Sequence, residues 1–169
     1  DGTIRPVRGV IGKLLAGKHA GLTTFIVPEA NLEQAKLISG ITLLPAASLR
    51  VLYEHFNSTS EDSTIRLVTT GGGISPIKKQ QAEQADVTLS EISGQAHAKR
   101  ALEIAAAGGH NILLNGPPGT GKSMLAKALA SILPELSHDE IVEVTHLHSL
   151  ASPDYDRIVT TRPFRSPHH

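Results

Sequence analysis

The sequence predicts an α/β protein, and three observations support this fold class. Apolar runs of strand length alternate with segments of helical period over residues 1–56. A polar stretch rich in glycine and glutamine follows at residues 57–88. A short apolar run, a glycine-rich turn and a new helix then succeed one another at residues 111–129. Because such alternation is typical of helices layered on a sheet, we expect two α/β units joined by a linker.

The first unit is predicted to begin with short, alternating elements. Strands are expected at residues 3–7, 22–27 and 41–44, where apolar and β-branched side chains gather. A helix is expected at residues 12–19. A second should begin after Asn31, which is a good N-cap with Gln34 three residues later, and a third should run from the N-cap Ser48 to Phe56. Residues 57–88 are expected to be a linker with room for one short hairpin, and residues 65–68 fit a parallel core strand poorly.

The second unit is expected to start near Leu89. An alanine-rich helix at residues 96–107 should end at the Gly108-Gly109 pair, and a buried strand is predicted at residues 112–114. A second helix should run to residue 133 and stop before Pro134. Residues 137–140, Ser-His-Asp-Glu, read as a capping box that opens a third helix.

One motif in this unit carries specific chemistry. Residues 116–123, Gly-Pro-Pro-Gly-Thr-Gly-Lys-Ser, fit G-x-x-x-x-G-K-[ST] at every fixed position. The glycines let backbone N–H groups wrap closely around phosphates, and the following helix directs its positive end at them. Lys122 would bridge the β- and γ-phosphates, and the Ser123 hydroxyl would ligate Mg²⁺. A glycine-rich turn without a ligand is disfavoured by the strand–turn–helix context, so we predict nucleoside triphosphate binding.

Composition sets further limits on this 169-residue chain. Lys+Arg and Asp+Glu both number 16, so the global charge does not indicate a polyanionic partner, although local patches are not excluded. The absence of cysteine excludes disulfides and thiolate metal sites. No apolar run approaches the roughly 20 residues of a membrane span and no signal-peptide pattern is present, so we expect a cytoplasmic protein. Because the only methionine is Met124, the chain is expected to be a fragment.

The histidines do not indicate a metal site. His146 and His148 are not four residues apart on a helix, and no carboxylate stands at a suitable ligand spacing. We therefore expect them to be solvated or to lie in an interface.

Three stretches of the chain resemble a known family. Residues 93–137, SGQAHAKRALEIAAAGGHNILLNGPPGTGKSMLAKALASILPELS, and residues 162–169, RPFRSPHH, resemble the magnesium-chelatase-like branch of AAA+ ATPases, in particular the ComM (YifB) family. Residues 5–31, RPVRGVIGKLLAGKHAGLTTFIVPEAN, resemble the Lon-protease-like domain that precedes the ATPase core in that family. The resemblance implies the rear part of a Lon-like (ribosomal S5 domain 2-like) α/β domain at 1–56, a linker at 57–88, and the first part of a P-loop AAA+ domain at 89–169.

The resemblance also implies site residues and partners. Lys122 is the implied catalytic residue, and Ser123 is the implied ligand of Mg²⁺. The residues implied to bind ATP are Gly116, Pro117, Pro118, Gly119, Thr120, Gly121, Lys122, Ser123 and Met124, with Ile92, Gly94 and Gln95 on the adenine side. The family implies a homo-oligomeric ring, expected as a hexamer, that drives DNA branch migration as a helicase in natural transformation. Arg162 and Arg165 are candidate contacts to the DNA backbone, or else a solvated or subunit-interface segment.

The elements that complete hydrolysis in AAA+ proteins are not recognisable in this sequence. A Walker B acidic pair, a polar sensor and an arginine finger are missing, so ATPase or helicase activity is expected of the full-length protein rather than of this chain alone. Two alternatives stay open: a Mg-chelatase-type ATPase subunit, against which the Lon-like stretch argues, and a non-catalytic nucleotide-binding module.

Overall fold

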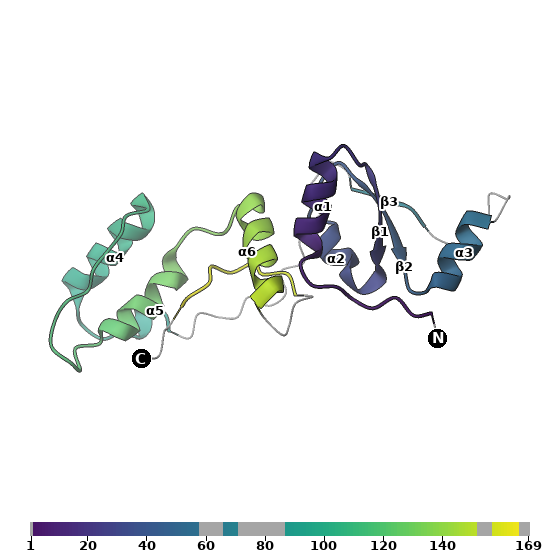
Figure 1. Ribbon diagram of the computed structural model, residues 1–169. Helices are drawn as coiled ribbons and strands as arrows, with labels where there is room; N and C mark the ends of the chain where they lie inside the picture. Colours follow the sequence, from purple (N-terminus) through teal and green to yellow (C-terminus); the bar gives the residue numbers. More distant parts are fainter. Residues whose placement is uncertain (1, 58–65, 71–86, 152–156, 166–169) are drawn as a thin grey trace. The chain divides into compact units, whose positions relative to one another are not determined.

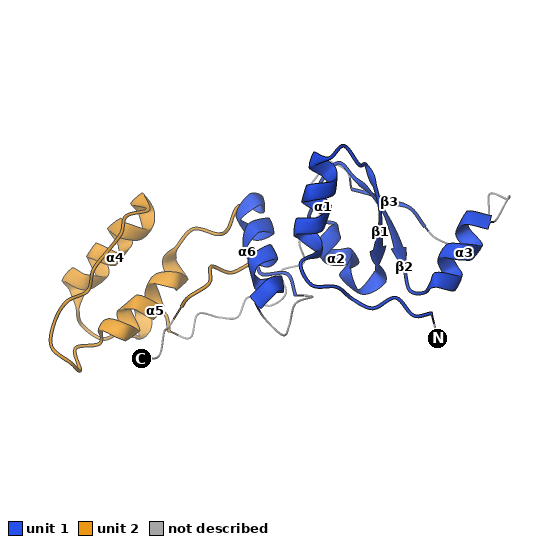
Figure 2. Cartoon of the chain, viewed as in Figure 1, with its two compact units in different colours: residues 1–77, 138–159 blue, residues 78–137, 160–169 orange. Residues whose placement is uncertain are grey.

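A computed structural model describes residues 2–57, 66–70, 87–151 and 157–165 (Figure 1). The chain forms two compact units, which Figure 2 distinguishes by colour. The N-terminal unit consists of residues 1–77 and 138–159, and the P-loop unit consists of residues 78–137 and 160–169. Helices accompany a small sheet, so the predicted α/β class is confirmed.

The N-terminal unit contains a three-stranded mixed sheet in the order β1-β2-β3. The strands are β1 (Thr24–Pro28), β2 (Thr42–Ala46) and β3 (Val68–Thr69). β1 and β2 run parallel, as expected of two strands joined through a helical connection, here a 3₁₀ turn (Glu29–Asn31) and α2 (Leu32–Ala35). β3 is antiparallel to β2 with Val68 opposite Leu43, which agrees with the prediction that this stretch is not a parallel core strand.

Helix α1 (Val10–His19) supplies the other side of this unit's core. Its Val10, Ile11 and Leu14 are buried, as are Leu43 and Leu44 of β2. Further buried apolar side chains come from the strands and from the segment that joins them: Val27, Ala35, Leu37, Ile38, Ile41 and Ala46. The predicted helix at residues 12–19 and the predicted strands at 22–27 and 41–44 are therefore confirmed, with small shifts of their ends.

Two predictions near the start of the chain are wrong. Residues 3–7 form no strand, and only Thr3 makes an isolated bridge, with Ser48. Asn31 precedes α2 but its side chain makes no capping hydrogen bond. Its Oδ1 instead accepts the N–H of Val7 at 2.8 Å, and its Nδ2 donates to the Val7 carbonyl at 3.1 Å. The Asn31 side chain thus forms hydrogen bonds with the N–H and the carbonyl of Val7, the groups that would otherwise pair with a neighbouring strand.

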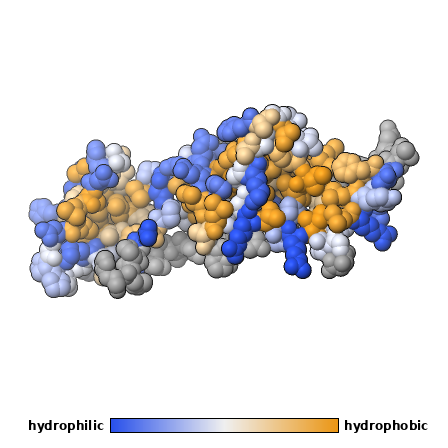
Figure 3. All heavy atoms as spheres, in the orientation of Figure 1, coloured by the Kyte–Doolittle hydropathy of each residue, from blue (hydrophilic) through white to orange (hydrophobic). Residues whose placement is uncertain are grey.

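Helix α3 (Leu49–Asn57) begins as the sequence predicts. The Ser48 Oγ accepts the N–H of Val51 at 3.3 Å, which is an N-cap contact. None of its side chains is buried, and Leu49, Tyr53 and Phe56 are each more than 60% exposed. Figure 3 shows hydrophobic residues, in orange, at the surface of both units. Most of the predicted linker, residues 57–88, lies outside the described residues.

The P-loop unit is built around two helices. A 3₁₀ turn (Leu89–Glu91) with a Thr88/Glu91 capping box leads into α4 (Ala96–Gly108), and α5 (Lys122–Ile132) packs against α4. Its core consists of Ile92, Leu102, Leu125 and Ala128. Both helices agree with prediction, and Gly109 ends α4 in the left-handed conformation.

The strand predicted at residues 112–114 is not formed. Ile112 and Leu114 pack against the core of the P-loop unit, whereas Leu113 is 90% exposed. A strand exists only when its backbone pairs with another, and the one sheet in the described residues belongs to the N-terminal unit. The prediction of a buried strand is therefore correct only for the partial burial of two side chains, and it is wrong for strand pairing.

Helix α6 (His138–Ala151) forms where a third helix is predicted. It belongs to the N-terminal unit, where it contacts α1. The predicted domain limits, 1–56, 57–88 and 89–169, come from resemblance to a family, whereas the two compact units are defined by contacts in space. The domain limits therefore stay a prediction. No helix in the described parts of the chain is long and apolar enough to cross a membrane.

Candidate phosphate-binding site

The glycine-rich turn at residues 116–121 leads directly into α5. Gly119 and Gly121 have φ values of 81° and 80°, and a Cβ atom at either position would meet nothing within 4 Å. Space is thus available, and the positive φ itself is what requires glycine at these two positions. The loop is open on this side, as a cradle for a ligand must be.

The first turn of α5 offers backbone donors to that open side. Its N-terminal amides, including those of Ser123 and Met124, have no acceptor within the helix, and the first intrahelical bond reaches Gly121 O from Leu125 N at 3.0 Å. Both side chains are exposed, Met124 by 47%. Since the helix is 11 residues long, its N-terminus carries the partial positive charge that favours an anion.

Lys122 is half-buried and its ammonium group lies over the loop. Its Nζ donates to the Pro117 carbonyl at 2.6 Å and to Thr120 Oγ1 at 3.3 Å, and Thr120 Oγ1 donates to the same carbonyl at 2.9 Å. An ammonium group and a hydroxyl therefore converge on one oxygen atom. A phosphate oxygen that binds there would replace the neutral carbonyl acceptor by a charged one, so that the ammonium group would face an anion.

The segment predicted to form the adenine side lies beside the loop at one point. The Gln95 Nε2 donates to the Thr120 carbonyl at 3.4 Å, and Gln95 is the one non-glycine residue with positive φ, 54°, in the described residues. Gly94 precedes it at φ 67°. Ile92 is only 8% exposed and packs in the core, and Lys99 Nζ donates to its carbonyl. The structure thus brings Gln95 to the loop and directs Ile92 inward.

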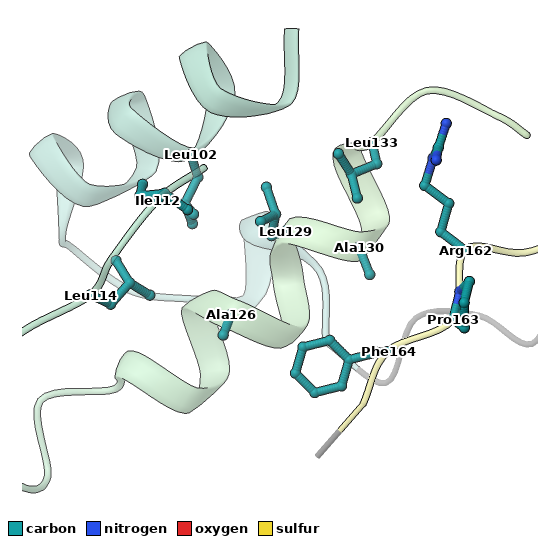
Figure 4. A pocket seen from close by; sticks show the side chains of 10 residues that line it. All are labelled: Leu102, Ile112, Leu114, Ala126, Leu129, Ala130, Leu133, Arg162, Pro163 and Phe164. Atoms are coloured by element: carbon teal, nitrogen blue, oxygen red, sulfur yellow. The ribbon is translucent and has the colours of Figure 1, made fainter. Parts of the chain in front are cut away.

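The two candidate DNA-contacting arginines differ in their surroundings. The Nε of Arg162 donates to the Pro134 carbonyl at 2.7 Å, immediately after α5, whereas Arg165 is exposed. Arg162 and Phe164 also line a pocket of about 270 Å³, shown in Figure 4. The rest of its lining is Leu102, Ile112, Leu114, Ala126, Leu129, Ala130, Leu133 and Pro163.

This pocket was not predicted from the sequence. Its walls come from α4, α5, residues 112–114 and residues 162–164, and no short-range pattern relates segments so far apart. The Thr88/Glu91 capping box was also missed, although its T-x-x-E spacing was readable. Among the described residues, no group of three or more His, Cys, Asp or Glu side chains is placed to hold a metal ion.

Comparison with known proteins gives a family match to the second half of the chain. The family described as "Magnesium chelatase, subunit ChlI" matches residues 88–169, which include the whole glycine-rich loop, α4, α5 and α6. The Thr88 capping box and the Arg162–Phe164 segment fall within the same match.

Three relatives illustrate the similarity. "Uncharacterized protein Rv2897c" of Mycobacterium tuberculosis H37Rv is 39% identical over 172 residues, covering all of this chain and 32% of that protein. "Competence protein ComM" of Haemophilus influenzae is 37% identical over 169 residues, covering 99% of this chain and 32% of that protein. "Uncharacterized protein YifB" of Escherichia coli K12 is 52% identical over 82 residues, 48% of this chain and 16% of that protein.

This chain therefore spans about a third of the length of the relatives that it matches from end to end. A shorter similarity joins it to "Archaeal Lon protease" of Archaeoglobus fulgidus, 44% identical over 54 residues, or 32% of this chain and 9% of that protein.

Proposed function

Because this chain belongs to the magnesium-chelatase-like family of AAA+-type ATPases that includes ComM and YifB, we propose that it binds ATP with Mg²⁺ at residues 116–123. The observation that carries this proposal is the convergence of Lys122 and Thr120 on the Pro117 carbonyl, beside the free amides of α5. A triphosphate presents several anionic oxygens. Lys122, Thr120 and the amides of α5 are all hydrogen-bond donors, and none of the hydrogen bonds described for the loop involves a carboxylate, which would repel a phosphate.

Each loop residue has a role in this proposal. Lys122 exchanges the Pro117 carbonyl for phosphate oxygens, and the backbone of Gly116, Pro118, Gly119 and Gly121 follows the polyphosphate closely. The exposed Ser123 hydroxyl ligates Mg²⁺, and the amide of Met124 contributes to the helix N-terminus. Bound ATP supplies a phosphoryl group whose transfer to water releases free energy.

The turn before α4 is proposed to lie on the adenine side. Gln95 is fixed against Thr120 by its hydrogen bond, and Gly94 leaves backbone uncovered next to it. Ile92 supports this turn from the core rather than by direct contact. Changing Gln95 would then affect nucleotide preference as well as affinity.

For the full-length protein we propose a homo-oligomeric ring, of six subunits, that uses ATP to move DNA branches during natural transformation in the cytoplasm. Membership of an AAA+-type family supports assembly, and the name of the Haemophilus influenzae relative supports a link with competence. Arg165, which is exposed, and Arg162 would contact the DNA backbone.

A second candidate function is that of the ATPase subunit of a magnesium chelatase. The description of the matching family favours it, since that family is named for the chelatase subunit. In this case ATP hydrolysis would drive insertion of Mg²⁺ into a porphyrin, and DNA would not be a substrate.

One comparison separates the two functions. ATP hydrolysis by the full-length protein is measured with branched DNA, with linear duplex of the same length, and with a porphyrin plus Mg²⁺. The first proposal predicts stimulation by branched DNA that is absent in Lys122→Ala. Stimulation by porphyrin alone would favour the chelatase function, and binding of ATP without hydrolysis under any condition would leave a non-catalytic module.

A further inference from the structure

The turn that precedes α4 in the P-loop unit contains an unusual backbone conformation. Gln95 has φ 54° and ψ 37°, which is the left-handed conformation, and Gly94 directly before it is also left-handed at φ 67°. A residue with a Cβ atom rarely adopts this conformation, because its Cβ comes close to the neighbouring carbonyl oxygen. The chain thus carries a glutamine at a position whose backbone favours glycine.

Contacts of the turn hold Gln95 in this conformation, as such strain requires. The Gln95 carbonyl accepts the N–H of Lys99 at 2.9 Å, which is the first backbone bond of α4. The Lys99 ammonium group donates to the carbonyl of Ile92 at the start of the turn. Ile92 packs in one hydrophobic core with Leu125 of α5. The turn is therefore fixed, through the core, to the helix that begins at the phosphate loop.

The Gln95 side chain does not serve the start of α4. A residue in this position commonly caps its helix with a side-chain oxygen, but Gln95 makes no capping hydrogen bond. Its Nε2 instead donates to the carbonyl of Thr120 in the phosphate loop, at 3.4 Å. This bond is longer than most N–H···O hydrogen bonds, so we expect its effect on affinity to be moderate.

Thr120 connects this contact to the other donors of the loop. Its hydroxyl donates to the Pro117 carbonyl at 2.9 Å and accepts a hydrogen bond from Lys122 Nζ at 3.3 Å. Its carbonyl belongs to the peptide group that also contains the N–H of Gly121. In a trans peptide the carbonyl and the N–H point in opposite directions, so a partner that holds the carbonyl also sets the direction of the N–H.

The peptide group between Thr120 and Gly121 lies where a ligand can approach. Among the described residues, no acceptor is found for the Gly121 N–H. A Cβ atom on Gly94, Gly119 or Gly121 would meet nothing within 4 Å. The amide that Gln95 orients is therefore available to an anion.

We propose that Gln95 is a positioning residue for phosphate binding: it orients the peptide group between Thr120 and Gly121 and so directs a loop amide at the triphosphate. This inference rests on the proposed nucleotide site, and it gives the turn a role toward the phosphates in addition to its place on the adenine side. The Gln95 side chain should therefore affect the binding of ligands that have no base and no ribose. A residue that contacted adenine alone would not affect them.

Inorganic tripolyphosphate with Mg²⁺ is the probe that separates these two roles. Its binding to the full-length protein is measured by calorimetric titration beside that of Mg-ATP, for the unsubstituted protein, Gln95→Met and Thr88→Ala. Gln95→Met keeps the length of the side chain and removes its donor. Thr88→Ala is the matched control, since Thr88 caps the 3₁₀ turn just before Gln95 and its described hydrogen bonds involve only Ser90 and Glu91.

We expect Gln95→Met to weaken tripolyphosphate binding about fivefold, as for the loss of one hydrogen bond, and to weaken Mg-ATP binding at least as much. Thr88→Ala should leave both affinities unchanged. Weaker binding of Mg-ATP alone would overturn the positioning role and leave Gln95 on the adenine side. Equal weakening by Thr88→Ala would also overturn it, because affinity would then follow the stability of the turn. No binding of either ligand by the unsubstituted protein would overturn the proposed function itself.

Gln95→Gly adds a measurement that separates positioning from stability. Glycine adopts the left-handed conformation without strain and is accepted before a helix, so hydrogen exchange across α4 should become slower. The same substitution removes the donor to Thr120, so binding of tripolyphosphate should become weaker. A purely structural role predicts instead that protection of α4 and affinity rise or fall together. Slower exchange with unchanged affinity, or loss of both, would contradict the positioning role.

Discussion

At the scale of single residues, the candidate phosphate site is defined by the hydrogen-bond acceptors of its lysine and hydroxyl side chains. Lys122 and Thr120 share the Pro117 carbonyl, and the Ser123 hydroxyl is left exposed beside them. The motif predicted these residue types, because a glycine-rich turn followed by a lysine and a hydroxyl presents several donors to an anion. It did not predict that the loop would satisfy Lys122 internally, since that depends on the path of the two prolines.

Ser123→Ala tests the proposed metal ligand. The substitution should weaken ATP binding roughly tenfold with Mg²⁺ present and leave it almost unchanged with EDTA, because one ligand to the cation is lost, worth about 1.4 kcal/mol. Calorimetric titration under both conditions measures this. Ser131→Ala is the control, since the Ser131 hydroxyl donates to the Ala128 carbonyl at the other end of the same helix. Equal weakening with and without Mg²⁺ would remove Ser123 from the metal site.

Asn31→Ser tests the reassigned role of Asn31. Serine caps helices as well as asparagine does, so a capping role predicts almost no loss of stability. The observed bridge to Val7 predicts a loss of about 2 kcal/mol in the free energy of unfolding, because buried backbone groups lose their partners. Urea denaturation decides between them, with exposed Glu29→Ser as the control.

At the scale of elements, helices followed from the sequence better than strands did. Ser48 starts α3 and Lys122 starts α5 as predicted, because caps and glycine turns act within a few residues. Residues 112–114 failed as a strand because a strand needs a partner from elsewhere in the chain. The packing of α6 on α1 was equally invisible, since residues 12 and 146 share no local pattern.

Leu113→Lys tests whether residues 112–114 act as an exposed strand edge. Its side chain is 90% exposed between two residues that pack inward, and such edges pair with other chains. The lysine should therefore reduce self-association of the 169-residue chain, measured by sedimentation velocity, without weakening ATP binding. Leu147→Lys, on a helix whose backbone is already bonded, should have a smaller effect. Equal effects would point to general hydrophobicity instead of an edge.

At the scale of the whole molecule, the fold class, the family and the presence of two units were predictable from the sequence, whereas the inclusion of residues 138–159 in the N-terminal unit was not. Lys+Arg and Asp+Glu both number 16, so the global charge does not favour a nucleic acid, and a contact with DNA would depend on a local group of basic residues. Since the chain spans about a third of its relatives' length, DNA binding, ring assembly and hydrolysis are properties to test in the full-length protein.

Arg165→Ala in that full-length protein tests the DNA contact. If Arg165 neutralises one phosphate, binding should weaken for all sequences and the slope of log affinity against log salt should fall by about 0.9. Arg50→Ala is a suitable control because Arg50 is already paired with Glu54 at 2.7 Å. An unchanged slope would assign Arg165 to a solvated or subunit-interface segment.

The most direct test of the central claim is a titration of Mg-ATP into the unmodified protein, Lys122→Ala and Lys127→Ala under identical conditions. Both lysines lie on α5, but only Lys122 contacts the phosphate loop. The account predicts saturable binding that Lys122→Ala weakens by roughly 10- to 100-fold, the range expected for loss of a charged hydrogen bond, and that Lys127→Ala leaves intact. Equal affinities for all three proteins would contradict the assignment of residues 116–123 as the nucleotide site.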